Sequence, residues 1–337
     1  MKYRRNRTLR PARVIVAVIV ALTSGAAVSA TAQAQTPIYP ARPVMVVVPF
    51  AAGGGNDIMA RLIAERMGRA LGQTFVIENR GGAAGTIGAR AVAKAPADGY
   101  TLMVGHSGLF AMAPGLYGTA AGFDPRHDFA PVGLIASFQQ LLLVHPSLPV
   151  HSVADLIALA RKEPGRITYA SAGIGSGAHV SSEFLSAMAA IKLTHVPYRG
   201  AGPAIADLVG GHVMATISAV PPSIQGVRAG LLRAIAVTGD KRLPILPDVP
   251  MVTEAGVPGY VAVIHYGMVA PAGTPRATIE RLNAALNAAL ASEDVRARIV
   301  DDGGDVLGGT PDRQATDIDQ EETKWGTLVR RLGLKPE

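Results

Sequence analysis

The chain has 337 residues, enough for one large domain or two of about 150 residues each, with a substantial buried core. Hydrophobic residues make up 49% of the chain and charged residues 17%, which excludes a disordered protein, and the absence of cysteine excludes disulfides, thiolate metal sites and a cysteine nucleophile. The formal charge of +7 favours an acidic partner only if the charge is spread over the folded part of the chain.

The positive charge is concentrated at the N-terminus. Six of the 32 basic residues lie within the first 13 positions, and no acidic residue precedes position 35. The apolar run 14–22 and Ala32-Gln33-Ala34 follow, which is the layout of a secretory signal peptide cleaved after Ala34. An uncleaved anchor and a twin-arginine signal at Arg4-Arg5 are the alternatives. The mature chain would keep 26 basic residues against 25 acidic ones, so we expect no nucleic-acid partner, and no later stretch of 18 apolar residues predicts a membrane span.

Short β-branched strands alternate with amphipathic helices along the rest of the chain, which is typical of an α/β fold with largely parallel sheets. The pattern predicts strands at 44–48, 74–78, 101–104, 141–144, 167–170, 193–196 and 213–218. It predicts helices from Gly55 to a stop at Gly72, after the glycine-rich stretch 81–88, and over 152–161, 176–190 and 203–209. The tail predicts a short helix at 295–300 and two long ones that begin at Thr274-Pro275 and Thr310-Pro311, each with threonine as N-cap.

Two further hydrophobic stretches, 130–138 and 261–269, are not followed promptly by a helix cap. We interpret them as strands that carry the chain between two lobes. Lobe 1 would then comprise 35–137 plus 261–337, and lobe 2 would comprise 138–260. This arrangement predicts a ligand cleft between the lobes.

Two glycine-rich loops each follow a strand and open a helix. They are Gly53-Gly54-Gly55-Asn56-Asp57 and the loop 171–179, with sequence SAGIGSGAH. Free backbone N–H groups and the positive end of the helix dipole attract anions at such positions. Two cradles in opposite lobes would hold both ends of a dicarboxylate, or one carboxylate and a polar group. A flexible connection with an ordinary N-cap is the structural alternative for each loop.

Individual side chains near strand ends are weaker candidates. His106 and Ser107 follow the strand 101–104 at the edge where open α/β sheets bind ligands, and Ser107 could donate to a ligand or cap a turn. Arg199 could pair with a carboxylate or form a surface ion pair. His179, in the first turn of its helix, could contact a ligand, and the alternative is that it only packs against neighbouring residues. Asp124 and Asp128 around His127 fit a turn better than a metal site.

Several enzyme and cofactor classes lack support. The loop Gly173-x-Gly175-x-x-Ala178 fits a loose dinucleotide pattern, but the next strand ends in His195-Val196-Pro197-Tyr198 without the required acid. A Walker A sequence, a G-x-S-x-G nucleophile and zinc-type histidine spacing are all missing from the sequence. We therefore expect no cofactor, no metal and no catalysis.

Six motifs occur in an order that resembles the Bug family, the extracytoplasmic substrate-binding receptors of tripartite tricarboxylate transporters. They are VVVPFAAGGGND at 46–57, ENRGGAAG at 78–85, ADGYTL at 97–102, HVPYRG at 195–200, LPDVP at 246–250 and APAGTP at 270–275. The resemblance runs from about Tyr39 to Pro336. It implies a type II periplasmic-binding-protein fold of two α/β domains joined by two hinge strands, which closes over a small organic carboxylate and delivers it to integral membrane transporter subunits. Free capture and release of the cargo would suit a monomer.

The resemblance also implies a ligand site without catalytic residues. Its contacts would be Phe50, Ala51, Gly54, Gly55, Asn56, Asp57, Ser107, Gly108, Ala172, Gly173, Gly175, Ser176, His179, Tyr198 and Ser218. Members of the family commonly carry two aspartates where this chain has Met214 and Ser218, and often a tryptophan where it has His265. The absence of an acid at Ser218 removes one partner for an ammonium group, which favours simple mono- or dicarboxylates over amino acids as cargo. A sensor for a signalling partner and an exported α/β enzyme are the rival functions.

Overall fold

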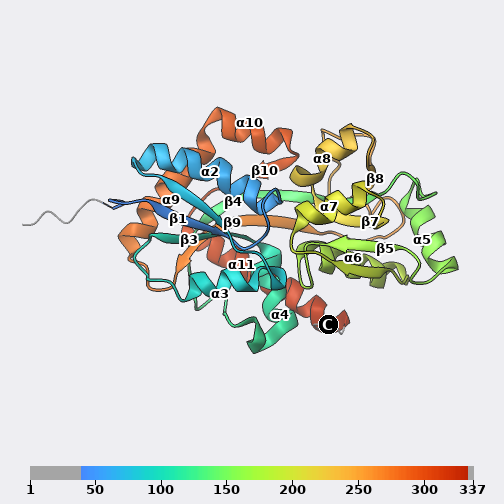
Figure 1. Ribbon diagram of the computed structural model, residues 1–337, viewed down its shortest axis with the longest axis horizontal. Helices are drawn as coiled ribbons and strands as arrows, with labels where there is room; N and C mark the ends of the chain where they lie inside the picture. The colour runs from blue at the N-terminus through green and yellow to red at the C-terminus, as the bar shows by residue number, and fades with distance from the viewer. Residues whose placement is uncertain (1–38, 333–337) are drawn as a thin grey trace, which may run out of the picture. The chain divides into compact units, whose positions relative to one another are not determined.

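Residues 39–332 are described by the structure, a computed structural model, so the expected leader at 1–34 lies outside the described residues. Strands and helices alternate along this part of the chain (Figure 1). The strands are β1 (Val44–Val48), β2 (Phe75–Asn79), β3 (Thr101–His106), β4 (Phe129–Val144), β5 (Thr168–Ser171), β6 (Thr194–Pro197), β7 (Ala215–Ala219), β8 (Arg233–Val237), β9 (Val263–Pro271) and β10 (Gly304–Val306). The helices are α2 (Gly55–Leu71), α3 (Thr86–Ala93), α4 (Ala113–Tyr117), α5 (Val153–Lys162), α6 (Gly177–Ala189), α7 (Ala201–Val209), α8 (Val220–Arg228), α9 (Arg276–Ala291), α10 (Glu293–Asp301) and α11 (Pro311–Leu332), with short turns η1 (Ala83–Gly85), η2 (Gly108–Met112) and η3 (Gly118–Ala121).

Local sequence signals account for most of these boundaries. Helix α2 ends at Gly72, which adopts the left-handed conformation (φ +70°) that favours glycine. Helix α5 begins at Ser152, whose hydroxyl accepts a hydrogen bond from the Asp155 N–H. The Asp155 carboxylate accepts a hydrogen bond from the His151 N–H at 2.9 Å. The predicted stop at Gly72 and the predicted helix start at Ser152 are therefore confirmed.

The strands form two sheets that share β4. The first sheet runs β2-β1-β3-β9-β4 with β10 on β4, and the second runs β4-β7-β5-β6 with β8 on β4. The expected strands at 130–138 and 141–144 are one continuous strand of 16 residues. The predicted break was wrong because Gln139 and Gln140 interrupt the hydrophobic pattern without interrupting the backbone pairing.

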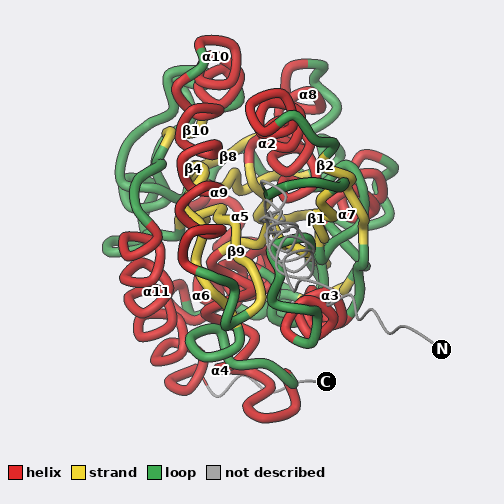
Figure 2. Tube along the Cα trace, turned by 90° about the vertical axis from the view of Figure 1, so that its left-hand side faces the viewer, coloured by secondary structure: helices red, strands yellow, loops and turns green. Residues whose placement is uncertain are grey.

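Helices cover both faces of each sheet, and Figure 2 shows the strands between helices. On the first sheet, α2 and α9 pack on one face, while α3 and the first half of α11 pack on the other. On the second sheet, α5 and α6 lie on one face and α7 and α8 on the other. Successive side chains of β4 point to opposite faces of the second sheet. Leu141 and Leu143 therefore join the apolar core on one face, and Leu142 and Val144 join the core on the other.

The two threonine-proline pairs of the tail behave differently. The Thr310 hydroxyl accepts a hydrogen bond from the Arg313 N–H at 3.2 Å, as expected of the N-cap of α11. The Thr274 hydroxyl donates to the Pro271 carbonyl, and Pro275 occupies the N-cap position of α9. The predicted Thr274 cap was therefore wrong. Within the described part of the chain, no helix is both long and apolar enough to span a bilayer.

Candidate functional site

A pocket of about 490 Å³, its open mouth included, lies where the two sheets meet along β4. Its size suits a small organic molecule. It is lined by Phe50, Gly54, Gly55, Asn56, His106, Gln140, Ala172, Ser176, Gly177, Ala178, Ala201, Ser218, Ala219, Pro222, Ile264 and Tyr266. Among these described lining residues there is no lysine, arginine, aspartate or glutamate.

Four helices begin at this pocket. The first-turn residues Gly55 and Asn56 of α2 and Gly177 and Ala178 of α6 line it, and so do Ala201 of α7 and the residues around the start of α8. Each of these helices follows a strand of a parallel pair, so their N-termini gather at the carboxyl edge of the sheets. The backbone N–H groups of the four α2 and α6 residues donate no hydrogen bond within the described part of the chain. The pocket therefore presents free donors and the positive ends of helix dipoles.

The loop before α2 is held by Asp57, which does not line the pocket. The Asp57 carboxylate accepts hydrogen bonds from the Gly53 N–H, the Arg61 guanidinium and the Asn79 amide. Burial opposes its ionisation, but these hydrogen bonds hold the pKa of the Asp57 carboxyl below its ordinary value. Asp57 thus supports the loop that brings Asn56 to the pocket, and the Asn56 amide is fixed by donating to the Val104 carbonyl.

The second glycine-rich loop uses much of its own hydrogen-bonding capacity internally. The Gly173 N–H donates to Ser171 Oγ, and the Gly175 N–H donates to His179 Nδ1 at 3.1 Å. Neither glycine lines the pocket, whereas Ala172 and Ser176 do. The donors that this segment offers to the pocket are thus the N–H groups of the α6 first turn.

Five other expected contacts lie outside the pocket lining. Ser107 Oγ accepts from the His265 N–H beside a smaller cavity, and the Tyr198 hydroxyl donates to Asp207. His179 packs against His195, with ring centroids 4.3 Å apart. Gly108 lies next to His106 and Gly177, and Ala51 approaches Gly200. Ser218 lines the pocket, and its hydroxyl donates to the Ala219 carbonyl.

Three more polar side chains line the pocket, of which His106 was expected at the ligand-binding edge of the sheet, while Tyr266 and Gln140 were not expected from the sequence. Burial lowers the pKa of His106 to about 4, so the ring is neutral at pH 7. Its Nδ1 accepts from the Leu109 N–H, which leaves the proton on Nε2. Burial raises the pKa of Tyr266, whose hydroxyl makes no hydrogen bond to the described residues. The third is Gln140, and its signal in the sequence is a glutamine pair inside a long apolar run.

A serine-histidine pair lies near the second loop, with Ser171 Oγ and His195 Nε2 2.6 Å apart. Such a pair is one element of a nucleophilic site. The Ser171 side chain is fully buried, however, and neither residue lines the pocket. This geometry gives Ser171 no access to a substrate.

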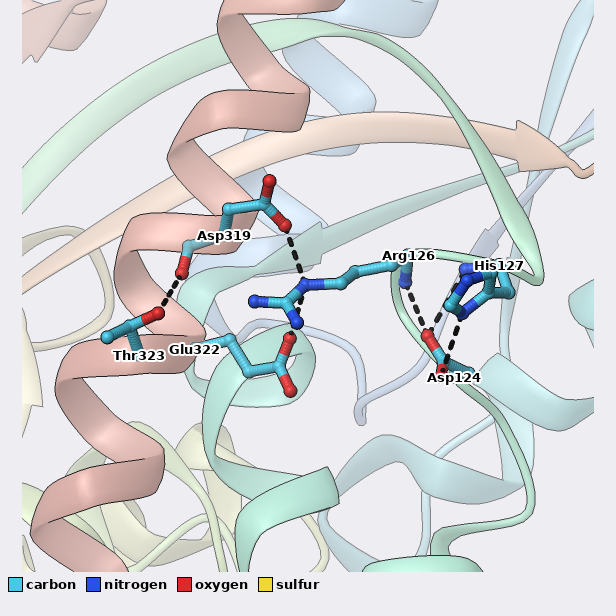
Figure 3. Close-up of polar contacts among 6 residues, drawn as sticks. All are labelled: Asp124, Arg126, His127, Asp319, Glu322 and Thr323. Atoms are coloured by element: carbon cyan, nitrogen blue, oxygen red, sulfur yellow. Dashed lines mark hydrogen bonds and ion pairs between the residues drawn. The ribbon is translucent and has the colours of Figure 1, made fainter.

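The turn 124–128 has a structural role (Figure 3). The Asp124 side chain accepts hydrogen bonds from the backbone N–H groups of Arg126 and His127, and Arg126 forms ion pairs with Asp319 and Glu322 of α11. No cluster of three metal-ligating side chains occurs among the described residues. The aspartate-rich segment is thus a turn that ties the start of β4 to the C-terminal helix.

Comparison with known sequences identifies the family. The profile of the family described as tripartite tricarboxylate transporter family receptor (TctC) matches residues 59–334. The protein BugT of Bordetella pertussis is 36% identical over 95% of this chain and 98% of its own length.

Three solved structures extend the comparison to the fold. Rpa4515 of R. palustris with adipate is 41% identical, with a TM-score of 0.86 over 89% of this chain and 100% of that one. The periplasmic binding protein BugD is 36% identical, with a TM-score of 0.85 over 89% and 100%. MatC of Rhodopseudomonas palustris with bound malate is 37% identical, with a TM-score of 0.84 over 86% and 100%. The fold is that of the periplasmic binding proteins, and the chain belongs to the TctC family of tripartite tricarboxylate transporter receptors, of the Bug type.

Proposed function

We propose that this receptor captures a small organic carboxylate in the pocket at the junction of its two sheets and releases it unchanged. The observation that carries the proposal is the convergence of four helix N-termini on a pocket whose lining has no charged side chain. Backbone N–H groups and helix dipoles stabilise an anion without a cationic side chain. The adipate bound by Rpa4515 and the malate bound by MatC support this ligand class.

We further propose that binding is coupled to closure of two lobes, 35–137 plus 261–337 and 138–260, about the strands that join them. A ligand that touches both lobes stabilises the closed form by its higher affinity for that form. The pocket supports this mechanism because it takes residues from both segments, such as Asn56 from the first and Ala178 from the second.

Export and delivery complete the proposal. The chain would be exported to the periplasm with its leader cleaved after Ala34, which mass spectrometry of the mature N-terminus tests. As a monomer it would hand its cargo to integral membrane transporter subunits. Recovery of those subunits with the tagged receptor, only when cargo is present, tests the delivery step.

Thermal unfolding tests carboxylate capture itself. A ligand that binds only the native state at a hundredfold excess over its Kd stabilises it by about 2.7 kcal/mol. We expect at least one acid from a panel of mono-, di-, tri- and aromatic carboxylates to raise the unfolding midpoint. No shift with any of them would contradict the proposal.

A pair of variants that each add one negative charge supplies the control. Ala178→Asp places a carboxylate in the first turn of α6 at the pocket, and Ala277→Asp makes the same change in the first turn of α9, where the side chain is exposed. Both positions tolerate an acid because it complements the helix dipole. We expect Ala178→Asp to abolish the ligand-induced shift and Ala277→Asp to retain it.

A further inference from the structure

Gln140 occupies the point at which β4 passes from the first sheet to the second. It pairs with Ala219 of β7, while the preceding residue, Gln139, pairs with Val263 of β9. The Gln140 side chain is 2% exposed and lines the pocket, whereas Gln139, which points to the opposite face of the strand, does not. One neutral polar side chain of β4 therefore reaches the ligand space.

The Gln140 amide is held in one orientation. The Ser181 hydroxyl of α6 donates to Gln140 Oε1 at 2.6 Å, and the Ser181 carbonyl accepts a hydrogen bond from the Tyr260 hydroxyl. The Gln140 backbone is fixed on both sides, because its N–H donates to Thr238 Oγ1 and its carbonyl accepts from the Thr238 N–H. With Oε1 engaged, the free part of the amide is its NH₂ group.

This NH₂ group faces the start of α6. Gln140 Nε2 lies 4.0 Å from the position that a Cβ atom would take at Gly177, and it has no hydrogen-bond partner among the described residues. The N–H groups of Gly177 and Ala178 beside it are also free. A buried amide donor and two backbone donors thus gather at the α6 end of the pocket.

A separate set of donors lies at the start of α2. The Tyr266 hydroxyl is so close to Gly55 that a Cβ atom there would clash with it, and the Ala201 N atom of α7 lies 3.9 Å from the Cβ position at Gly54. The remaining lining is mostly apolar, including Phe50, Pro222 and Ile264. The lining therefore offers one group of donors at the start of α6 and another at the start of α2, beside the polar atoms of His106, Ser176 and Ser218.

We propose that Gln140 is a specificity-determining residue, which binds a second carboxylate of the cargo together with the first turn of α6 and so selects dicarboxylates over monocarboxylates. This inference rests on the proposed function, since it assumes that a first carboxylate is bound at the α2 end. A monocarboxylate of equal length would place a methyl group against the Gln140 NH₂ group and leave a buried donor without a partner. Sites built to hydrogen-bond a substrate group reject analogues that lack it.

The experiment measures Kd by calorimetry for pairs of acids that differ only in one terminal group, adipate with hexanoate and succinate with butyrate. We expect the wild type to bind at least one dicarboxylate more tightly than its partner. Gln140→Met should raise the Kd for that dicarboxylate by about tenfold or more, because a hydrogen bond to a charged group is lost. Binding of the monocarboxylate should stay within about twofold, since the methionine side chain has a similar volume.

Gln139→Met is the matched control, because it makes the same change one residue earlier on the face turned away from the pocket. Both polar atoms of the Gln139 amide are buried without a partner, so the variant should fold and bind both acids like the wild type. Ser181→Ala is the second test variant, and it tests the role of the Gln140 amide even if Gln140→Met does not fold. It keeps Gln140 but frees its amide to rotate, and we expect a loss of several-fold confined to the dicarboxylate.

The outcomes separate this inference from the proposed function. The role of Gln140 would be overturned if Gln140→Met raised the Kd for both acids equally or for neither. It would also be overturned if the wild type bound monocarboxylates as tightly as dicarboxylates. Each of these results would leave carboxylate capture intact. If the wild type binds no carboxylate at all, the proposed function fails and the inference fails with it.

Discussion

Three buried histidines stand out at the scale of single residues. Burial lowers the pKa of His106 to about 4 and that of His179 to about 4, and burial next to His179 lowers the pKa of His195 to about 3. Two of the rings are used in the neutral form, since His106 Nδ1 accepts from the Leu109 N–H and His179 Nδ1 accepts from the Gly175 N–H. Protonation would destroy these hydrogen bonds. The folded structure around the pocket therefore requires neutral imidazoles.

The free energy of unfolding should consequently fall as the pH falls from about 6.5 to about 4. In this window the unfolded chain binds protons that the folded chain does not, so stability rises with pH through it. His106 alone, shifted from 6.5 to about 4, accounts for about 3 kcal/mol at one pKa unit per about 1.4 kcal/mol. His265 acts in the opposite direction but above this window: burial lowers its pKa and Asp317 raises it by more, so its contribution is gained as the pH falls toward 6.5 and is constant below that. Urea unfolding between pH 7 and pH 4 measures the slope.

The variant His106→Asn identifies the source of this dependence. It keeps a hydrogen-bond acceptor near the Leu109 N–H and removes the titratable ring, so its stability should decline less steeply with falling pH than that of the wild type. Parallel curves for variant and wild type would show that His106 does not contribute.

The residues of the pocket also show how far the sequence could predict the site. Phe50, Gly54, Gly55, Asn56, Ala172, Ser176 and Ser218 were expected near a ligand and do line the pocket. Most of them lie in loops that can be predicted from local glycine patterns in the sequence. His106 was expected at the end of its strand, but Gln140 and Tyr266 reach the pocket from within strands, and their positions depend on the register of β4 and β9, which no local pattern specifies.

At the scale of elements, the pocket is formed largely by the N-terminal ends of helices. The sequence predicted the N-termini of α2 and α6 at the pocket because glycines precede both, but α7 and α8 reach it too. Helix α7 begins after Gly200, and α8 begins at two prolines in a segment without a glycine loop. Their convergence follows from the parallel order of β5, β6 and β7, which is a property of the topology.

Identical Thr-Pro pairs begin α9 and α11 in the sequence, and only Thr310 caps its helix through its side chain. We expect Thr310→Ala to destabilise the protein by about 1 kcal/mol, because the Arg313 N–H loses its acceptor. In a protein of this size the thermal midpoint should fall by roughly 2 °C.

The matched variant is Thr310→Ser, which keeps the hydroxyl and should retain the wild-type midpoint. Equal losses for Thr310→Ala and Thr310→Ser would assign the effect to the threonine methyl group instead of the cap.

At the scale of the whole described chain, two groups of small residues meet beside the pocket. A Cβ atom at Gly200 would lie 2.8 Å from the Ala51 Cβ atom and 3.1 Å from the Ala51 N atom. Gly81 approaches the Arg199 carbonyl in the same region, and Gly173 approaches Ala84. Backbone from the segments 50–54 and 81–84 thus packs directly on backbone from 173 and 199–202. Under the proposed closure, these contacts form only when the two lobes come together.

Gly200→Ala should therefore weaken carboxylate binding by roughly tenfold, because an extra methyl group between closely packed segments costs about 1–3 kcal/mol in the closed form. Gly200 has a φ of +153°, so the variant also strains its own backbone. Gly230→Ala controls for that strain, since Gly230 has a φ of +69° and its Cβ position meets no atom within 4 Å. We expect both variants to lower the unfolding midpoint of the ligand-free protein and only Gly200→Ala to raise the Kd. If the two raise the Kd equally, the effect comes from backbone strain and the contact between the segments plays no part in binding.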